Sequence, residues 1–348
     1  MTGSPIIGTA ARQAAAWLSQ RLRAGAQLTS DSRAVGRGDA FFAYPGERQD
    51  GRRHIGSAVD AGAGAVLLEA AGAEAHLAAL AERGTPAHPV PGLREEAGPI
   101  AAAWLDEPSA RLTVVAVTGT NGKTSCTHWI AQGWNLQAAG QQPAAAVIGT
   151  LGTGVPGEFA SGTDAAERPG PGPGDDLPAA SLTTPDALEL QQSLARFVGR
   201  GIELVAIEAS SIGLVQGRLN GTRLAVAVLT NLTRDHLDYH RTMQAYADAK
   251  ARLFGWTGLA AVVVNLEDPV SLRMLDEAGI GPVRIGYLVD DRPPTTRDAL
   301  ARADDCDALL VATPQDAFGR VVLTRVTRAS APGPDAADDV RTESIDLQ

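Results

Sequence analysis

Short apolar strands that alternate with helices are the feature of this sequence that most constrains its fold. The first, LTVVAVTG at 112–119, leads through a glycine turn into an expected helix over 122–140. Strands that are apolar throughout need cover on both faces, which helices between parallel strands provide. The sequence therefore predicts an α/β protein with a mostly parallel sheet. Further strands are expected at 202–210, 224–231 and 260–265, and further helices at 187–201 and 243–254.

The length predicts two domains, since 348 residues is about twice the usual size of one domain. We predict a small α/β domain over 1–109, whose last helix begins near residue 97, and a central domain over 110–328 that is incomplete at its C-terminal end. Within the central domain, 153–180 is dense in glycine, proline and aspartate, which predicts a mobile surface loop. Residues 329–348 are polar without periodicity, and we expect a frayed tail.

The charge balance and the apolar content exclude several classes of protein. The formal net charge is −10, so the chain lacks the basic surface that binds phosphate backbones, and we expect no nucleic-acid partner. No apolar run has the roughly 18 residues of a membrane-spanning helix, so no membrane insertion is expected. The N-terminus does not resemble a signal peptide, and two cysteines cannot build a disulfide framework. These features predict a cytoplasmic protein.

Lysine is nearly absent from this chain. Only Lys123 and Lys250 are lysines among the 30 basic residues, and the others are arginines. A composition that uses arginine wherever a positive charge is sufficient makes the remaining lysines informative. A lysine is needed where a compact ammonium group, or an amine that can lose its proton, is required.

A candidate phosphate loop follows the strand at 112–119. The glycines of such a loop let backbone N–H groups approach an anion, its lysine reaches the β- and γ-phosphates, and its threonine hydroxyl binds Mg²⁺. The general spacing would place a glycine at position 117, where this chain has Val117. The alternative is an ordinary strand–helix turn that happens to contain Gly-Lys-Thr. The loop residues are Gly119, Thr120, Asn121, Gly122, Lys123 and Thr124.

Polar residues follow the carboxyl ends of the expected strands, where open α/β sheets bind their ligands. Glu208 and Ser210 follow one strand, and Asn231 and His236 follow the next. Glu208 and His236 could supply an oxygen and a nitrogen to a metal ion, although Mg²⁺ prefers oxygen. The alternatives are an ordinary loop histidine for His236 and a helix-capping or ion-paired carboxylate for Glu208.

Several motifs together resemble the Mur ligase family and its relatives, the folylpolyglutamate synthetases. The loop T-G-T-N-G-K-T at 118–124 is similar to the ATP loop of these enzymes. The likeness is strongest to the Mur ligases that add the third amino acid of the peptidoglycan stem peptide. The matching blocks are S-L-T-T-P-D at 181–186, E-A-S-S at 208–211, G-L-V-Q-G-R at 213–218, T-N-L-T-R-D-H-L-D-Y-H at 230–240 and Y-A-D-A-K at 246–250.

The resemblance implies that the chain uses ATP and Mg²⁺. Lys250 matches the family lysine whose amine takes up CO₂ as a carbamate, which arginine cannot do. The implied ATP-binding residues are the loop 119–124 and Asn231. The implied catalytic residues are Lys123, Lys250, His236 and Glu208, and the implied metal ligands are Thr124, Glu208, His236 and the carbamylated Lys250.

The resemblance also implies a site for a uridine-nucleotide substrate. The N-terminal segments T-S-D-S-R at 29–33, G-D-A-F-F at 38–42 and G-E-R-Q-D-G-R-R at 46–53 resemble the family's uridine-nucleotide-binding domain. Close relatives often have His-Gln where this chain has Glu47-Arg48, and many have histidine where it has Ile212. The implied substrate contacts are Ser32, Glu47, Arg48, Gln49, Thr183, Thr184, Ser210, Gln216 and Arg218.

The implied function is ATP-dependent amide-bond formation in peptidoglycan precursor synthesis. An amino acid, meso-diaminopimelate or L-lysine, would be joined to UDP-N-acetylmuramoyl-L-alanyl-D-glutamate through an acyl phosphate. The family's third, C-terminal domain has no counterpart in this sequence, so we expect little turnover by this chain alone. We also expect a monomer.

Two alternatives stay open at this point. One is a binding-only fragment that holds ATP and the UDP substrate without turnover. The other is a ligase like folylpolyglutamate synthetase, which the D-S-R motif at 31–33 and the G-D-A-F-F motif at 38–42 disfavour, since that enzyme lacks a uridine-binding domain.

Overall fold

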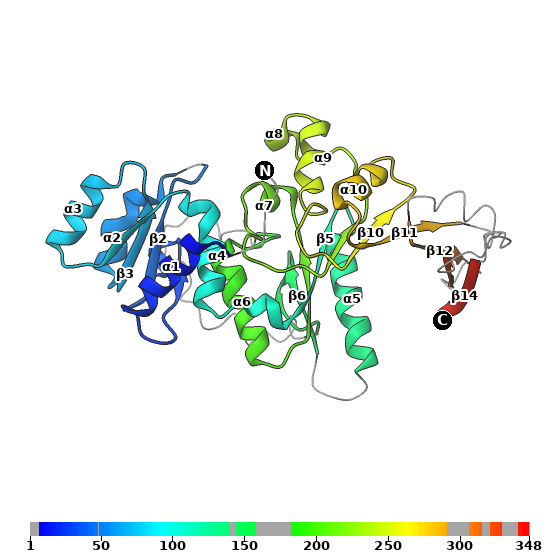
Figure 1. The fold of residues 1–348 in the computed structure, drawn as a ribbon, viewed down its shortest axis with the longest axis horizontal. Coiled ribbons are helices and arrows are strands. Elements are labelled where there is room, and N and C mark those ends of the chain that lie inside the picture. Colours follow the sequence, from blue (N-terminus) through cyan, green and yellow to red (C-terminus); the bar gives the residue numbers. More distant parts are fainter. Residues whose placement is uncertain are drawn as a thin grey trace. The chain divides into compact units, whose positions relative to one another are not determined.

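The computed structural model describes residues 7–47, 49–138, 144–157, 182–290, 306–314, 321–328 and 340–347. By their internal contacts these residues form two compact units (Figure 1), and each unit is described by itself. The first unit comprises residues 3–114 and 127–223, and the second comprises residues 115–126 and 224–348.

The N-terminal part of the first unit is a four-stranded parallel sheet with helices on both faces. Its strands lie in the order β1 (Leu28–Thr29), β2 (Ala40–Ala43), β3 (Ala65–Glu69) and β4 (Ala87–Val90). The α-helices are α1 (Thr9–Ser19), α2 (Ile55–Asp60), α3 (Glu74–Glu82) and α4 (Leu93–Trp104). Short 3₁₀ helices occupy η1 (Ser32–Ala34), η2 (Gly51–His54) and η3 (Pro108–Arg111).

Two hydrophobic cores lie on the opposite faces of this sheet, because successive side chains of a strand point to opposite faces. Phe42 and Leu67 pack with α1 and α4 in one core. Phe41 and Val66 pack with α2 and α3 in the other core. Strand β2 is buried throughout and β3 is buried up to its last residue, Glu69, so both have the continuous apolar run of a doubly covered sheet.

The rest of the first unit contains β6 (Ala145–Gly149), β7 (Gly152–Gly154) and β8 (Leu204–Glu208), with helices α6 (Ala187–Gly199) and α7 (Ser211–Val215). Strand β6 runs parallel to β8 and antiparallel to β7. Helix α6 packs against α4 of the N-terminal part. This packing joins segments on both sides of residue 109 in one unit, so the units divide the chain differently from the predicted domains, which stay a prediction.

The second unit is built on parallel strands followed by an antiparallel hairpin. Strands β5 (Thr113–Thr118), β9 (Val226–Leu229), β10 (Ala261–Asn265), β11 (Val283–Val289) and β12 (Ala308–Pro314) are parallel neighbours in this order. Strands β13 (Val321–Arg328) and β14 (Val340–Leu347) continue the sheet antiparallel. The helices are α8 (Leu237–His240), α9 (Met243–Ala251) and α10 (Ser271–Ala278), and α5 (Lys123–Gln137) begins after β5.

Two expectations about irregular segments need correction. The predicted loop 153–180 begins as ordered structure, because Thr153 and Gly154 belong to β7, and its residues 158–180 lie outside the described residues. The predicted frayed tail was wrong for Val340–Leu347, which pair along their whole length with β13. Backbone hydrogen bonds satisfy this polar strand, so it needs no apolar periodicity. Residues 329–339 of the expected tail lie outside the described residues.

Among the described residues, no helix is both long enough and apolar enough to cross a membrane.

Candidate functional site

The predicted phosphate loop connects β5 to α5 and needs its first glycine. Gly119 has a φ of 148°, which side-chain-bearing residues rarely adopt. A Cβ at this position would lie 1.8 Å from Oγ1 of Thr230. Thr230 in turn donates a hydrogen bond of 2.6 Å to the carbonyl oxygen of Asn121. The backbone of the loop is therefore fixed from the end of β9, and Thr230 is a loop-supporting residue that the sequence did not single out.

Asn231, predicted to bind ATP, contacts the loop itself. Its Oδ1 accepts from the backbone N–H of Asn121 at 3.0 Å, and its Nδ2 donates to the Asn121 carbonyl at 3.2 Å. Both backbone groups of Asn121 are thus held by one side chain. The structure shows Asn231 as a support of the loop, and its contact with ATP stays a prediction.

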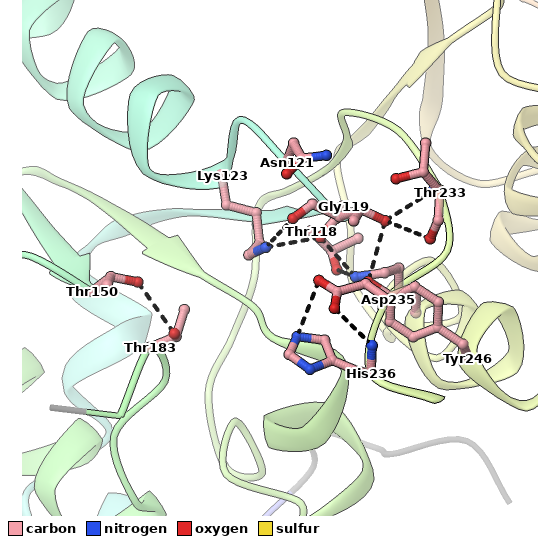
Figure 2. A network of polar contacts seen from close by, with 12 residues as sticks. Thr118, Gly119, Asn121, Lys123, Thr150, Thr183, Thr233, Asp235, His236 and Tyr246 are labelled. Carbon is pink, nitrogen blue, oxygen red and sulfur yellow. Dashed lines mark hydrogen bonds and ion pairs between the residues drawn. The ribbon is translucent and has the colours of Figure 1, made fainter. Parts of the chain in front are cut away.

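The two lysines converge on one carbonyl oxygen. Nζ of Lys123 donates to the carbonyl of Gly119 and to that of Thr120, both at 2.9 Å (Figure 2). Nζ of Lys250 donates to the same Gly119 carbonyl at 2.8 Å. Lys250 is only 1% exposed and also lies 4.5 Å from the centre of the Tyr246 ring. Along the chain, Lys250 is 131 residues from Gly119 and 127 residues from Lys123. Helix α9 carries Lys250 and brings it to the loop.

The surroundings of Lys250 favour its neutral amine. Burial is the larger cause and repulsion by Lys123 the second, and together they lower the pKa of Lys250 to about 7, against a smaller opposing effect of Asp235. An ordinary lysine is almost wholly protonated at neutral pH. Lys250 therefore offers a nucleophilic amine under conditions in which an exposed lysine would not.

Tyr246 links α9 to the phosphate loop. It is fully buried, and its hydroxyl lies 3.2 Å from Oγ1 of Thr120. The Thr120 hydroxyl donates to the carbonyl of Thr233 and accepts from the Thr233 N–H. Because the single proton of Thr120 goes to that carbonyl, the Tyr246 hydroxyl donates to Thr120. Tyr246 therefore contacts both the loop and Lys250.

His236 lies just before α8 in a left-handed backbone conformation, with a φ of 49°. Its Nε2 is 3.7 Å from Oδ2 of Asp235, and its ring lies edge-on to Tyr246. Figure 2 shows His236, Asp235 and Tyr246 on the same side of the loop as Lys123. The sequence analysis predicted a role for His236 but not for Asp235. The Asp235 carboxylate lies beside the His236 ring, and its charge opposes the lowering of the Lys250 pKa.

In the first unit, Glu208 ends β8 as a fully buried carboxylate. Its Oε1 accepts from the backbone N–H of Thr150 at 2.9 Å, and its Oε2 accepts from the Thr150 hydroxyl at 3.2 Å. Thr150 is a further residue that the sequence did not single out.

A compact polar group follows Glu208. The hydroxyl of Thr184 donates to the Glu208 carbonyl at 2.7 Å and lies 3.0 Å from Oγ of Ser210. Nη1 of Arg218 donates to the Thr184 carbonyl at 2.7 Å, and its Nε and Nη2 donate to Oε1 of Gln216 at 2.9 and 2.6 Å. The structure therefore brings together four of the predicted substrate contacts, and it fixes the guanidinium fork of Arg218.

The N-terminal candidates lie in separate turns of the first unit. Ser32 begins η1, which Asp31 caps by accepting from the Arg33 N–H. The Arg33 side chain also donates to Asp31 and lowers the pKa of that carboxyl.

The predicted contacts at 47–49 are partly visible. Oε1 of Glu47 accepts from Nη2 of Arg94 at 3.3 Å, and Oε1 of Gln49 lies 3.3 Å from Nε2 of His54. Arg48 lies outside the described residues. Glu47 therefore pairs with Arg94, and its contact with the substrate stays a prediction.

The donor groups suit a magnesium ion only in part. Mg²⁺ binds through one or two carboxylates, with waters and substrate phosphate oxygens completing its coordination. Glu208 and the hydroxyl of Thr124, the second residue of α5, are oxygen donors of this type. His236 offers nitrogen, a poorer ligand for Mg²⁺. In the described parts of the chain no group of three or more His, Cys, Asp or Glu side chains is placed to hold a metal ion.

Two family models match the chain. The model described as Mur ligase middle domain matches residues 117–291, half of the chain. The model described as Mur ligase family, catalytic domain, matches residues 26–104. The two ranges fall on either side of residue 109.

Curated relatives share the name UDP-N-acetylmuramoyl-L-alanyl-D-glutamate--2,6-diaminopimelate ligase. The protein of that name from Ralstonia nicotianae is 46% identical over 290 residues, which cover 81% of this chain and 51% of the relative. The one from a Janthinobacterium species is 45% identical and covers 77% of this chain and 49% of the relative. This chain therefore spans about half the length of the curated relatives it matches.

Solved structures give the same picture of the fold. A solved structure of a diaminopimelate ligase of the same name is 30% identical, with a TM-score of 0.61 over 86% of this chain and 53% of that one. A MurF structure from Acinetobacter baumannii is 15% identical, with a TM-score of 0.53 over 97% of this chain and 60% of that one, and shows likeness of fold alone.

Proposed function

The chain belongs to the Mur ligase family, and from this premise we propose that it serves the ATP-dependent ligation of 2,6-diaminopimelate to UDP-N-acetylmuramoyl-L-alanyl-D-glutamate. The name that its relatives share supports this choice of substrates and favours diaminopimelate over lysine as the amino acid. The reaction belongs to peptidoglycan precursor synthesis, and its use of ATP supports a cytoplasmic location. The monomeric state stays a prediction.

The proposed reaction has two steps. The γ-phosphoryl group of ATP passes to the side-chain carboxylate of the substrate's glutamate, which releases ADP and leaves an acyl phosphate. The amine of the amino acid then attacks the acyl carbon, an amide bond forms, the amine proton is lost and inorganic phosphate leaves. Both steps need stabilisation of charge on transferring phosphoryl oxygens.

The phosphate loop supports the first step. Lys123 lies at the first turn of α5 beside two loop carbonyls, so its ammonium can move to the phosphates of ATP without leaving the loop. The loop N–H groups and the N-terminal end of α5 add partial positive charge. Asn231 and Thr230 hold this backbone in place and so preserve its geometry during the transfer.

Lys250 is proposed to act as a carbamate. Its neutral amine attacks CO₂, a carbon–nitrogen bond forms, and the nitrogen loses a proton, so a buried cation becomes an anion. The lowered pKa of Lys250 and the repulsion from Lys123 both support this change. When bound, Mg²⁺ would neutralise phosphate charge, and Thr124, Glu208, His236 and the carbamate are the residues proposed to hold it.

The first unit is proposed to bind the UDP substrate. Arg218 presents a fork that Gln216 and Thr184 keep in one orientation, and such a fork suits a carboxylate or a phosphate. Thr183, Ser210 and the N-terminal residues Ser32, Glu47, Arg48 and Gln49 are the other proposed contacts.

The observation that carries the proposal is that the chain's two lysines meet at the carbonyl of a phosphate loop. The test is trapping of the acyl phosphate with hydroxylamine, with the chain, Mg-ATP and the UDP-dipeptide. We expect a hydroxamate that needs both ligands and is absent from Lys123→Ala and Lys250→Arg. Arg252→Ala, an exposed change two positions beyond Lys250, is the control and should keep the signal.

A second measurement separates ligation from binding alone. If the chain binds ATP and the UDP-dipeptide but no hydroxamate forms, the binding-only alternative replaces the ligase for this chain. If Lys123→Ala binds ATP as well as the unaltered chain does, the phosphate loop is wrongly assigned.

A further inference from the structure

The segment after strand β9 contacts the phosphate loop on one side and polar side chains of β10 and β11 on the other. We propose that Tyr287 of β11 is a positioning residue for the phosphates of ATP, which acts on the phosphate loop through Thr230 and does not touch the nucleotide. The inference rests on the proposed function in one respect, that the loop binds ATP. All of its residues belong to the second unit.

The residues after β9 support the loop at several points. The Thr230 hydroxyl donates to the Asn121 carbonyl, and the Asn231 carbonyl accepts from the backbone N–H of Thr120 at 2.9 Å. The Thr233 N–H donates to the Thr120 hydroxyl. A displacement of this segment must therefore displace the loop backbone as well. Loop N–H groups are the groups that converge on a bound phosphate, so the position of the segment bears on phosphate binding.

Strand register places Tyr287 beside this segment. Val264 of β10 pairs with Leu229, the last residue of β9, and Asn265 of β10 pairs with Tyr287 of β11. Thr230, Asn265 and Tyr287 therefore lie next to one another at the carboxyl edge of three neighbouring parallel strands. This edge is where open α/β sheets bind their ligands, and the phosphate loop follows β5 at the same edge.

Two side chains donate to the Thr230 carbonyl oxygen. Nδ2 of Asn265 donates to it at 3.0 Å, and the Tyr287 hydroxyl donates to it at 3.2 Å. A carbonyl oxygen has two lone pairs, so it can accept both bonds. Oδ1 of Asn265 accepts from the Glu267 N–H at 3.0 Å, which orients the amide with its Nδ2 toward Thr230. The Thr230 carbonyl is thus held from both β10 and β11.

The Tyr287 hydroxyl keeps its proton at neutral and mildly alkaline pH. Burial is the largest cause, and the acidic groups Cys126, Glu267 and Asp268 add to it, so that the pKa of Tyr287 rises to about 12. A protonated phenol can donate, whereas a phenolate can only accept. Tyr287 therefore acts as a donor to the Thr230 carbonyl throughout this range.

The rest of the network limits the effect of losing one hydroxyl. Asp268 accepts from the Leu232 N–H through Oδ2 and from the Val270 N–H through Oδ1. These bonds and the one from Asn265 remain when Tyr287 is replaced by phenylalanine, so the segment should shift without unfolding. We therefore expect a loss of affinity of the size of one neutral hydrogen bond, about three- to tenfold.

The experiment measures the binding of two probes, Mg-ATP and Mg-tripolyphosphate, the second of which carries the phosphate chain without the nucleoside. Calorimetry gives both dissociation constants for the unaltered chain and its variants, and Tm is measured for each. Tyr287→Phe should weaken both probes by the same factor, about three- to tenfold, because the phosphate loop binds both. Tyr44→Phe, which removes another partly buried tyrosine hydroxyl, in the first unit, is the matched control and should leave both affinities unchanged.

Thr230→Val separates positioning from a general loss of stability. Valine keeps the shape of the side chain but loses the bond to Asn121. If Tyr287 acts through Thr230, Tyr287→Phe should weaken binding less in the Thr230→Val background than in the unaltered chain, since residues of one network couple. A general structural effect would be equal in both backgrounds, so fully additive losses would overturn the inference.

The two probes also distinguish the ways of failing. If Tyr287→Phe weakens ATP binding and leaves tripolyphosphate binding unchanged, Tyr287 contacts the nucleoside and the positioning role is overturned. If Tyr287→Phe lowers Tm and leaves both affinities unchanged, Tyr287 is structural only, and the inference is again overturned. If Lys123→Ala binds tripolyphosphate as well as the unaltered chain does, the phosphate loop is wrongly assigned, and the proposed function fails together with the inference.

Discussion

At the scale of single residues, the Gly119 carbonyl is the point of the second unit where the two lysine side chains meet. Two ammonium groups, those of Lys123 and Lys250, donate to this one oxygen. Placing two cations together in a buried setting is unfavourable, and one of them can relieve the repulsion by losing its proton. Lys250 is the more buried partner and the one whose pKa falls to about 7. The arrangement therefore prepares one lysine for phosphates and the other for chemistry on its amine.

The cost of burying Lys250 predicts a gain of stability on its replacement. The pKa of Lys250 is about 7 in the folded chain and near the ordinary lysine value of 10.5 in the unfolded chain. The unfolded chain thus binds more protons between these values, so stability contributed by this site rises with pH from about 7 to about 10 and is lowest below 7. In CO₂-free buffer, Lys250→Met should raise the unfolding free energy near pH 7 by the order of a few kcal/mol.

Chemical denaturation at several pH values measures this effect. Lys250→Met should also flatten the rise of stability between about pH 7 and 10 that the unaltered chain shows. Arg252→Met, at an exposed position of the same segment, serves as the control. Equal slopes for Lys250→Met and the unaltered chain would mean that Lys250 titrates normally.

Gly119 predicts a loss of binding from the smallest possible addition. In Gly119→Ala, the new Cβ would overlap Oγ1 of Thr230 at 1.8 Å, and the φ of 148° would be strained. The loop must shift, and the Thr230 bond to Asn121 shifts with it. We expect ATP affinity to fall by at least about tenfold, because misplaced loop N–H groups no longer converge on the phosphates. Calorimetry gives the affinity, and circular dichroism confirms that the variant is folded.

The site residues that the sequence analysis predicted differ from those that it missed in how far along the chain their partners lie. Lys123 and Gly119 lie in a local strand–turn–helix pattern, which is visible along the chain. Thr230 acts on Asn121 from 109 residues away, and Thr150 acts on Glu208 from 58 residues away. Nothing in the neighbourhood of Thr230 or Thr150 in the chain indicates these contacts. They arise only when parallel strands bring their carboxyl ends to one edge.

At the scale of elements, the apolar strands could be predicted from the sequence, whereas the polar strand β14 could not. The expected strand at 112–119 is Thr113–Thr118, and the expected helix at 243–254 is Met243–Ala251. Such elements can be recognised in the sequence by the apolar residues that they bury. Strand β14 is held by its backbone pairing with β13. This pairing leaves no pattern of apolar side chains by which the strand could be predicted.

Helix α4 shows how a tertiary contact can extend an element beyond its local pattern. The helix was expected from residue 97 and begins at Leu93, with Pro99 inside it. A proline lacks the N–H that would bond to the carbonyl four residues earlier. That carbonyl, of Glu95, accepts from Nδ2 of Asn220 instead. A side chain 125 residues away thus satisfies the group that Pro99 leaves without a helical partner.

Replacement by alanine should have opposite effects on stability at two helix glycines. Alanine favours a helix over glycine by about 0.5–1 kcal/mol when nothing else changes. Gly133 in α5 has nothing within 4 Å of a new Cβ, so Gly133→Ala should stabilise the chain by about that amount. Gly98 in α4 would place its Cβ 2.1 Å from the Asn220 carbonyl oxygen. Gly98→Ala should therefore destabilise it by about 1–3 kcal/mol or more.

Denaturant unfolding of the two alanine variants tests this pair under one protocol. Helix propensity alone would give both variants the same sign, and that result would contradict the close approach of α4 to Asn220. ATP affinity should be unchanged in Gly133→Ala, since Gly133 lies in the third turn of α5, away from the loop residues 119–124.

At the scale of the whole molecule, the proposed ligands divide between the two units. The candidate ATP groups, the phosphate loop with Asn231 and Lys250, lie in the second unit. Glu208 and the group around Arg218 lie in the first. The sequence predicted two domains from length and motifs. It did not predict that α6 would pack with the N-terminal helices, because that packing depends on which faces of α4 and α6 are apolar in the folded chain.

This division predicts that each ligand can be lost without the other. Arg218→Ala removes a fork that Gln216 and Thr184 orient, so affinity for the UDP-dipeptide should fall by about tenfold or more, as for a charge-assisted pair. Its ATP affinity should stay unchanged, because the bonds that Arg218 makes to Gln216 and Thr184 lie within the first unit, whereas the phosphate loop belongs to the second. Lys123→Ala should show the reverse, with ATP affinity lost and UDP-dipeptide affinity kept. Titration of each variant with each ligand alone gives the four affinities. Changes at sites without shared partners act independently, so a loss of both affinities in either variant would show that the two ligand sites are coupled and would contradict the division.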